Sequence, residues 1–167
     1  MGLLGLCAAC ALILVGCGYR PLVAERLPDG IRSLHLASIA NGTYRPGIEG
    51  QLGAAILRRL QLATQVQVVP EPSAEAVLGG RIATYQNFPI AFHQTDIGQR
   101  FLVRLTLQMT LTDRQKGNVL LKEDVVGEAY YTAGTGAAAT RAAEEEAAQR
   151  AVQDLAARAV DRLLEDL

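Results

Sequence analysis

The feature that most constrains the fold is a regular alternation of apolar and polar residues from Phe101 to Thr112. Every odd-numbered residue from 101 to 111 is apolar, the even-numbered residues from 104 to 112 are polar, and Leu102 departs from the pattern. A period of two predicts a strand with one buried face and one wet face, as in antiparallel sheets. Residues 113–118 predict a turn and 119–131 a returning strand, so we expect a long hairpin.

Three shorter strands are predicted before this hairpin. Residues 31–40 and 66–68 alternate apolar with polar side chains, and a third strand is expected over 76–85. Gly79-Gly80 in this third strand suggests a β-bulge.

Two segments have the periodicity of helices. An apolar stripe at steps of four follows Pro46, which suits the first turn of a helix that runs to about residue 63. The Ala-, Glu- and Arg-rich segment 137–167 predicts the second helix. We therefore expect an α+β fold, a two-layer sandwich with two helices packed on one face of a mostly antiparallel four- to five-stranded sheet, the other face being polar. The expected core includes Leu52, Ile56, Leu105, Leu107, Met109, Leu155 and Leu163.

The N-terminus predicts export and lipidation. Residues 3–15 are nearly all apolar, too short to span a bilayer but of the length of a signal-peptide core. They end in Leu14-Val15-Gly16-Cys17, which resembles the lipobox of bacterial lipoproteins, although no Lys or Arg precedes it. We expect a signal peptide over 1–16, a lipid on Cys17, a tether over 17–30 and a single domain over 31–167. A buried N-terminal element with a free cysteine is the alternative.

No catalytic or metal-binding pattern stands out. The two histidines, His35 and His93, lack partners at metal-ligand spacing, and His35 is expected on the surface. Residues 134–139 match the dinucleotide pattern G-x-G-x-x-A, but the predicted helix after them is the last element, so no βαβ unit follows. Glu144-Glu145-Glu146 is expected to be solvated. We predict no enzymatic activity and no cofactor apart from the covalent lipid. The formal net charge of -1 argues against a nucleic-acid partner.

Several segments together resemble a known family. They are Cys17–Pro21, Ile39–Glu49 and Leu111–Leu120, followed by the Glu/Ala/Arg-rich final helix. Their order over most of 17–167, together with the lipobox, is similar to the LptE family of lipopolysaccharide-assembly lipoproteins from Gram-negative bacteria.

This resemblance implies a function and a location. Members of the family are lipid-anchored by acyl chains such as palmitate at the periplasmic face of the outer membrane. They plug and help assemble the large β-barrel LptD, bind lipopolysaccharide and are not enzymes. The alternative is a lipoprotein accessory subunit of another cell-envelope transport complex.

The resemblance also implies where lipopolysaccharide would bind. The family's basic positions lie in the turn between the middle strands and near the start of the last helix. Here the turn spans 92–100, with His93 in place of an arginine and Arg100 as a second cation, and the helix position falls near Arg141. Because lipopolysaccharide carries phosphates and carboxylates, arginine donors suit it. The alternative is that all three residues are ordinary solvated side chains.

Overall fold

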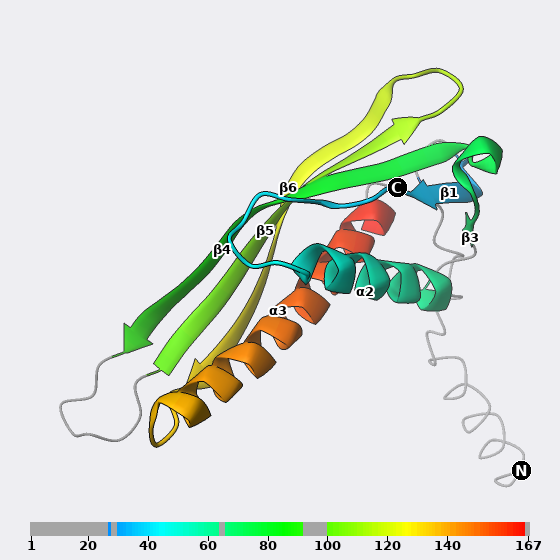
Figure 1. Cartoon of the computed structure of the whole chain (residues 1–167). Coiled ribbons are helices and arrows are strands. Elements are labelled where there is room, and N and C mark those ends of the chain that lie inside the picture. Colours follow the sequence, from blue (N-terminus) through cyan, green and yellow to red (C-terminus); the bar gives the residue numbers. More distant parts are fainter. Residues whose placement is uncertain (1–26, 28–29, 64–65, 92–99, 166–167) are drawn as a thin grey trace, which may run out of the picture.

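A computed structural model describes residues 27, 30–63, 66–91 and 100–165 (Figure 1). In chain order the elements are β1 (Ser33–Leu36), β2 (Ala40–Asn41), α2 (Ile48–Ala63), β3 (Gln67–Val68), the short 3-10 helix η2 (Glu71–Ser73), β4 (Ala76–Ala91), β5 (Arg100–Asp113), β6 (Val119–Thr132) and α3 (Ala137–Glu165). They form a two-layer α+β sandwich in which α2 and α3 cover one face of the sheet (Figure 1). The predicted fold class is therefore confirmed.

The sheet combines a long antiparallel part with a short parallel part. Its six described strands run in the order β3-β1-β4-β5-β6, and β2 also pairs with β4. β4, β5 and β6 are antiparallel, whereas β1 is parallel to both of its neighbours and β2 is parallel to β4. The strand count exceeds the prediction because the segment expected as one strand over 31–40 forms the two short strands β1 and β2.

The predicted bulge at Gly79-Gly80 is wrong. Both glycines pair in unbroken register with β5, and the shift in register comes after them, between Ile82 and Thr84. Gly80 has a packing role instead, since a Cβ there would lie 2.9 Å from the Leu107 Cδ1 atom. The register shift comes where the pairing of β2 with β4 stops, just after Ile82.

The N-terminal end of α2 differs slightly from the prediction. Pro46 lies in the turn before the helix and not in its first turn, because Gly47 adopts a positive φ of 83° and the helix begins at Ile48. The side-chain amide of Asn41 fixes this junction. It donates to the Arg45 carbonyl at 2.8 Å and to the Glu49 carboxylate at 2.8 Å.

The core lies between the sheet and the helices, as predicted. The expected residues are at most 2% exposed: Leu52, Ile56, Leu105, Leu107, Met109, Leu155 and Leu163. Alanines of α3 allow the helix to approach the sheet closely, and the approach is tightest at Gly127. A Cβ on Gly127 would lie 2.4 Å from the Leu155 Cβ and 2.6 Å from the Ala151 carbonyl oxygen.

The face of the sheet away from the helices is not uniformly polar, contrary to the prediction. Leu102, the exception in the alternation, is only 4% exposed and lies outside the main core. It pairs with Phe88 on one side and Tyr130 on the other. Cross-strand partners in register point to the same side of a sheet. The three therefore form an apolar row on the free face, near the end where β5 begins.

None of the described helices is long and apolar enough to cross a membrane. Across the same described ranges, no group of three or more His, Cys, Asp or Glu side chains is placed to hold a metal ion.

Candidate functional site

Two of the four residues singled out from the sequence lie in the structure. Cys17 and His93 fall outside the described residues. Arg100 begins β5, and Arg141 lies in the early part of α3; both are exposed. They share one end of the domain, since Arg100 pairs with Thr132 at the end of β6 and α3 begins a few residues later (Figure 1). The patch that they were expected to form with His93 stays a prediction.

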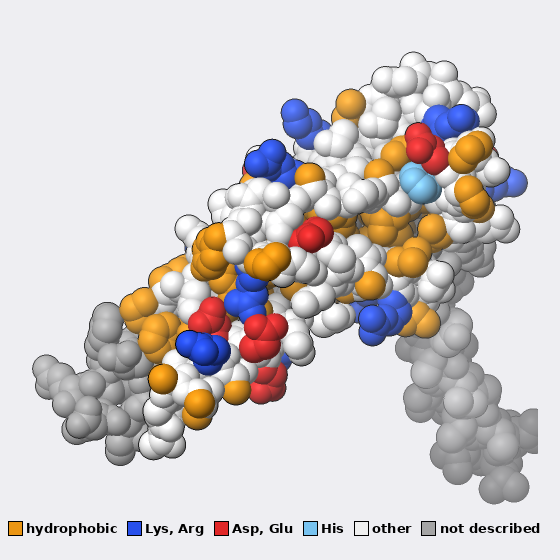
Figure 2. Space-filling model, in the orientation of Figure 1, with side chains coloured by type: hydrophobic (Ala, Val, Ile, Leu, Met, Phe, Trp, Pro, Cys, Tyr) orange, Lys and Arg blue, Asp and Glu red, His pale blue; other side chains and the backbone are white. Residues whose placement is uncertain are grey.

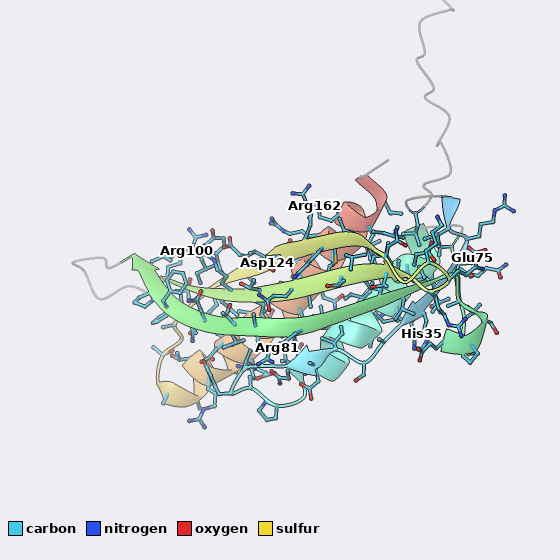
Figure 3. All side chains as sticks on the ribbon, turned by 90° about the horizontal axis from the view of Figure 1, so that it is seen from above. His35, Glu75, Arg81, Arg100, Asp124 and Arg162 are labelled. Carbon is cyan, nitrogen blue, oxygen red and sulfur yellow. The ribbon has the colours of Figure 1, made fainter. Side chains whose placement is uncertain are left out.

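Arg100 belongs to the free face of the sheet. Its guanidinium carbon lies 4.8 Å from the centroid of the Tyr130 ring, which is the distance of a cation–π contact. Figure 3 shows Arg100 at the end of the long strands. Arg141 lies on a helix of the other layer, so any patch joining the two would have to extend around this end of the sandwich.

A second arginine lies beside the apolar row, and it is neutralised. Arg104 Nε donates to the Glu128 carboxylate at 2.5 Å, and its guanidinium carbon lies 5.5 Å from the centroid of the Phe88 ring. Among the described residues, Arg100 has no such carboxylate partner. We call Phe88, Arg100, Leu102, Arg104 and Tyr130 the aromatic–arginine end.

The aromatic–arginine end has the chemistry of an anion site beside an apolar surface. An arginine stacked on a ring keeps its in-plane N–H groups available for bidentate binding of a phosphate or carboxylate. Tyr130, which is 47% exposed, supplies apolar contact area next to it. The sequence signal for this site is the break in the alternation at Leu102.

A polar network at the opposite face was missed by the sequence analysis. Arg45, from the loop before α2, donates to the Tyr85 hydroxyl oxygen at 2.8 Å and forms ion pairs with Glu144 and Glu145 of α3. Burial and the neighbouring Glu144 carboxylate raise the pKa of Tyr85, so its hydroxyl stays protonated at neutral pH. Through Arg45, this network links the β2–α2 loop to both β4 and α3.

Within the acidic run of α3, Glu145 and Glu146 are exposed, as predicted, and Glu144 is half-buried, but all three carboxylates are also paired with arginines. Glu144 and Glu145 bind Arg45, and Glu146 pairs with Arg150 at 2.6 Å. No sequence pattern connects Arg45 with residues about a hundred positions away. Figure 2 shows the result on this face, where acidic and basic side chains are intermixed over the first half of α3.

Two other predicted features have structural explanations. The His35 ring Nδ1 lies 3.2 Å from the Val69 carbonyl oxygen, to which it donates, so His35 is a half-buried, hydrogen-bonded residue and not a plain surface one. Gly134 of the G-x-G-x-x-A pattern lies close against the start of α3. A Cβ on Gly134 would lie 2.6 Å from the Ala139 Cβ. This close packing accounts for Gly134 without a nucleotide.

A family model described as "LptE: Lipopolysaccharide-assembly" matches residues 31–163. No curated protein matches the chain.

Several solved structures share the fold. A minor lipoprotein from Acinetobacter baumannii has a TM-score of 0.56 and 17% identity, over 81% of this chain and 94% of that one. An uncharacterized lipoprotein B from Nitrosomonas europaea has a TM-score of 0.55 and 17% identity, over 84% of this chain and 83% of that one. A protein from Xanthomonas campestris has a TM-score of 0.53 and 13% identity, over 83% of this chain and 89% of that one. At these identities the likeness is one of fold.

Proposed function

This chain belongs to the LptE family of lipopolysaccharide-assembly proteins, and we propose that it is an outer-membrane lipoprotein that binds lipopolysaccharide and plugs an LptD-type β-barrel. The observation that carries the proposal is the match of the family model over residues 31–163. The two-layer fold, with an uncovered sheet face that is mostly polar, supports it. The lumen of a large barrel is polar and contains water, so a polar sheet face can be solvated there without burying itself against lipid or an apolar protein surface.

The anchor in this proposal is the lipidated Cys17. A single acyl chain binds a membrane only marginally, so stable residence requires more than one chain on the processed N-terminus. Intact mass spectrometry of the mature protein tests this part. We expect a chain that begins at residue 17 and carries a diacylglyceryl group and an N-acyl chain. A mature N-terminus elsewhere, or no added lipid mass, would contradict it.

Lipopolysaccharide binding in this proposal uses the basic residues at one end of the domain. Arg100 is held on Tyr130 with no carboxylate partner in the described part of the chain, so its donors are available to a phosphate. Arg141 is exposed at the same end, and His93 is proposed to add an imidazole nitrogen as a third polar contact. Because Arg104 is already paired with Glu128, it serves as the matched arginine that does not bind.

Two experiments on full-length protein test the proposal. Purification from detergent-solubilised outer membrane should recover a stoichiometric large barrel protein, whereas an inner-membrane permease would support an accessory subunit of another transporter. Arg100→Gln with Arg141→Gln should weaken lipopolysaccharide binding about tenfold at physiological salt, and Arg104→Gln should change it much less. Equal affinities in the double variant and the wild type would reject this end of the domain as the binding surface.

A further inference from the structure

A second polar site lies in the middle of the free face, with Gln108 about 20 Å along β5 from Leu102 at the strand rise of about 3.4 Å per residue. It is a hollow of about 480 Å³. Two cross-strand rows form it, Gly79–Thr110–Lys122 and Arg81–Gln108–Asp124, each running over β4, β5 and β6. Figure 3 shows Arg81 and Asp124 near the middle of the long strands.

The hollow exists because residue 79 has no side chain. A Cβ on Gly79 would meet no atom within 4 Å, so packing does not require a glycine. Gly79 is also not among the glycines with positive φ, so the backbone does not require one either. Its neighbour Gly80 is different, because a Cβ there would press on Leu107. The glycine at position 79 therefore has one structural consequence, which is open space above the sheet.

The walls of the hollow carry charges that the protein itself does not pair. Arg81 and Lys122 are exposed, and neither forms an ion pair with any described residue. The Arg81 guanidinium lies beside Gly42 at the β2 edge of the hollow, since a Cβ on Gly42 would lie 2.8 Å from the Arg81 Nε atom. Asp124 likewise has no cationic partner in the described part of the chain, although cations flank the hollow on β4 and β6. Gln108 and Thr110 lie between them on β5. The site thus presents two cations together with an amide, a hydroxyl and a carboxylate.

We propose that this hollow binds an anionic saccharide, that is, a sugar carrying phosphate or carboxylate groups. Arg81 and Lys122 donate to its anionic groups, and Asp124, Gln108 and Thr110 hydrogen-bond its hydroxyls. A protein partner fits less well, because protein hot spots are centred on aromatic or arginine anchors in apolar pockets. Met109, which borders the hollow, has its side chain buried in the core on the other face of the sheet, so it supplies no apolar anchor here. That the sugar comes from lipopolysaccharide rests on the proposed function.

The test uses the full mature chain in detergent and a defined probe, the phosphorylated core oligosaccharide from completely deacylated lipopolysaccharide. Gly79→Gln places a side chain in the hollow, where its Cβ would meet no atom within 4 Å, and Arg81→Gln with Lys122→Gln removes both cations. The charge-matched control is Arg58→Gln with Arg114→Gln, two exposed arginines outside the hollow. We expect each hollow variant to lose about tenfold or more in affinity for the probe, with the control unchanged.

Several results would overturn this inference. They are hollow variants that bind the probe as the control does, a dephosphorylated oligosaccharide that binds equally well, or a polyglutamate peptide that binds as tightly as the sugar. Failure of the proposed function gives a different result, in which the wild type binds neither intact lipopolysaccharide nor the probe. If intact lipopolysaccharide binds and only Arg100→Gln with Arg141→Gln weakens it, the function stands and the hollow is rejected.

Discussion

The two faces of the sheet are built from alternate residues of the same three strands, yet one face is apolar and buried and the other is mostly polar and exposed. On the helix-covered face, Leu105, Leu107 and Met109 are at most 2% exposed and pack under α2 and α3. On the free face, the alternate residues of β4, β5 and β6 include guanidinium, amide, hydroxyl and carboxylate groups, as in Arg81, Gln108, Thr110 and Asp124. One set of positions therefore determines stability, and the other is free to determine binding.

The largest difference is expected between neighbouring residues of β5. Leu107→Ala should lower the free energy of unfolding by about 2–5 kcal/mol, because it leaves a cavity under the helices. Gln108→Ala, one residue further, should change it by less than about 0.5 kcal/mol, since Gln108 is an exposed residue of the free face. Chemical denaturation of both variants measures the ranking. Equal costs would mean that the two faces are assigned wrongly.

Glycines on opposite faces give a second contrast. Gly127→Ala should destabilise the domain by about 1–3 kcal/mol, because its Cβ would collide with Leu155 and the Ala151 carbonyl. Gly79→Ala faces open space and should stay within about 0.5 kcal/mol of the wild type. Thermal unfolding of the two variants measures this difference in stability. Loss of stability at residue 79 would contradict the hollow on the free face.

Leu102 differs from the core residues because it is buried although it lies on the free face of the sheet and not under the helices. Leu102→Ala should cost roughly 1–2 kcal/mol, less than Leu107→Ala, since the apolar row around it borders solvent and can relax. The change should also loosen Tyr130 and with it Arg100. Denaturation, together with tyrosine fluorescence, measures both effects. A cost as large as that of Leu107→Ala would place Leu102 in the main core.

The smallest effect concerns the hairpin turn. Asp113 accepts the backbone N–H groups of Lys116 and Gln115 at 2.9 and 2.8 Å, and these bonds hold its pKa below the ordinary value of 3.8. The carboxylate therefore contributes stability above about pH 4, and this is lost as the pH falls below that value. Asp113→Asn cannot titrate, so the stability gap between wild type and variant should close in acid. Denaturation of both proteins at about pH 6 and pH 3 measures this difference in the free energy of unfolding. A difference that grows in acid would contradict a lowered pKa for Asp113.

The sequence could predict the elements that bury an apolar face, because burial imposes a period that is visible in one strand or helix. Such periods predicted the hairpin of β5 and β6, both helices and the seven core residues. They did not predict the division of residues 31–40 into β1 and β2, because this division depends on which residues of β4 pair with each strand. The register shift after Ile82 also depends on a neighbouring strand.

The candidate sites were less predictable, because they are made of residues that meet only across strands or layers. Arg45 reaches Glu144 and Glu145 from a distant loop, and no local pattern marks that contact. The row of Phe88, Leu102 and Tyr130 needs the register of three strands. The hollow over Gly79 needs the same register, and it also needs the finding that Gly79 is not required by packing, which a sequence cannot supply.

Amide chemical-shift mapping on the isotope-labelled mature chain tests the difference between the two faces most directly. Addition of the deacylated, phosphorylated oligosaccharide should shift amides of Gly79, Arg81, Gln108, Thr110, Lys122 and Asp124 and those around Arg100. Amides of α2 and of the buried part of α3 should stay in place. Shifts confined to the two helices, with the free face of β4, β5 and β6 unchanged, would contradict the assignment of binding to that face.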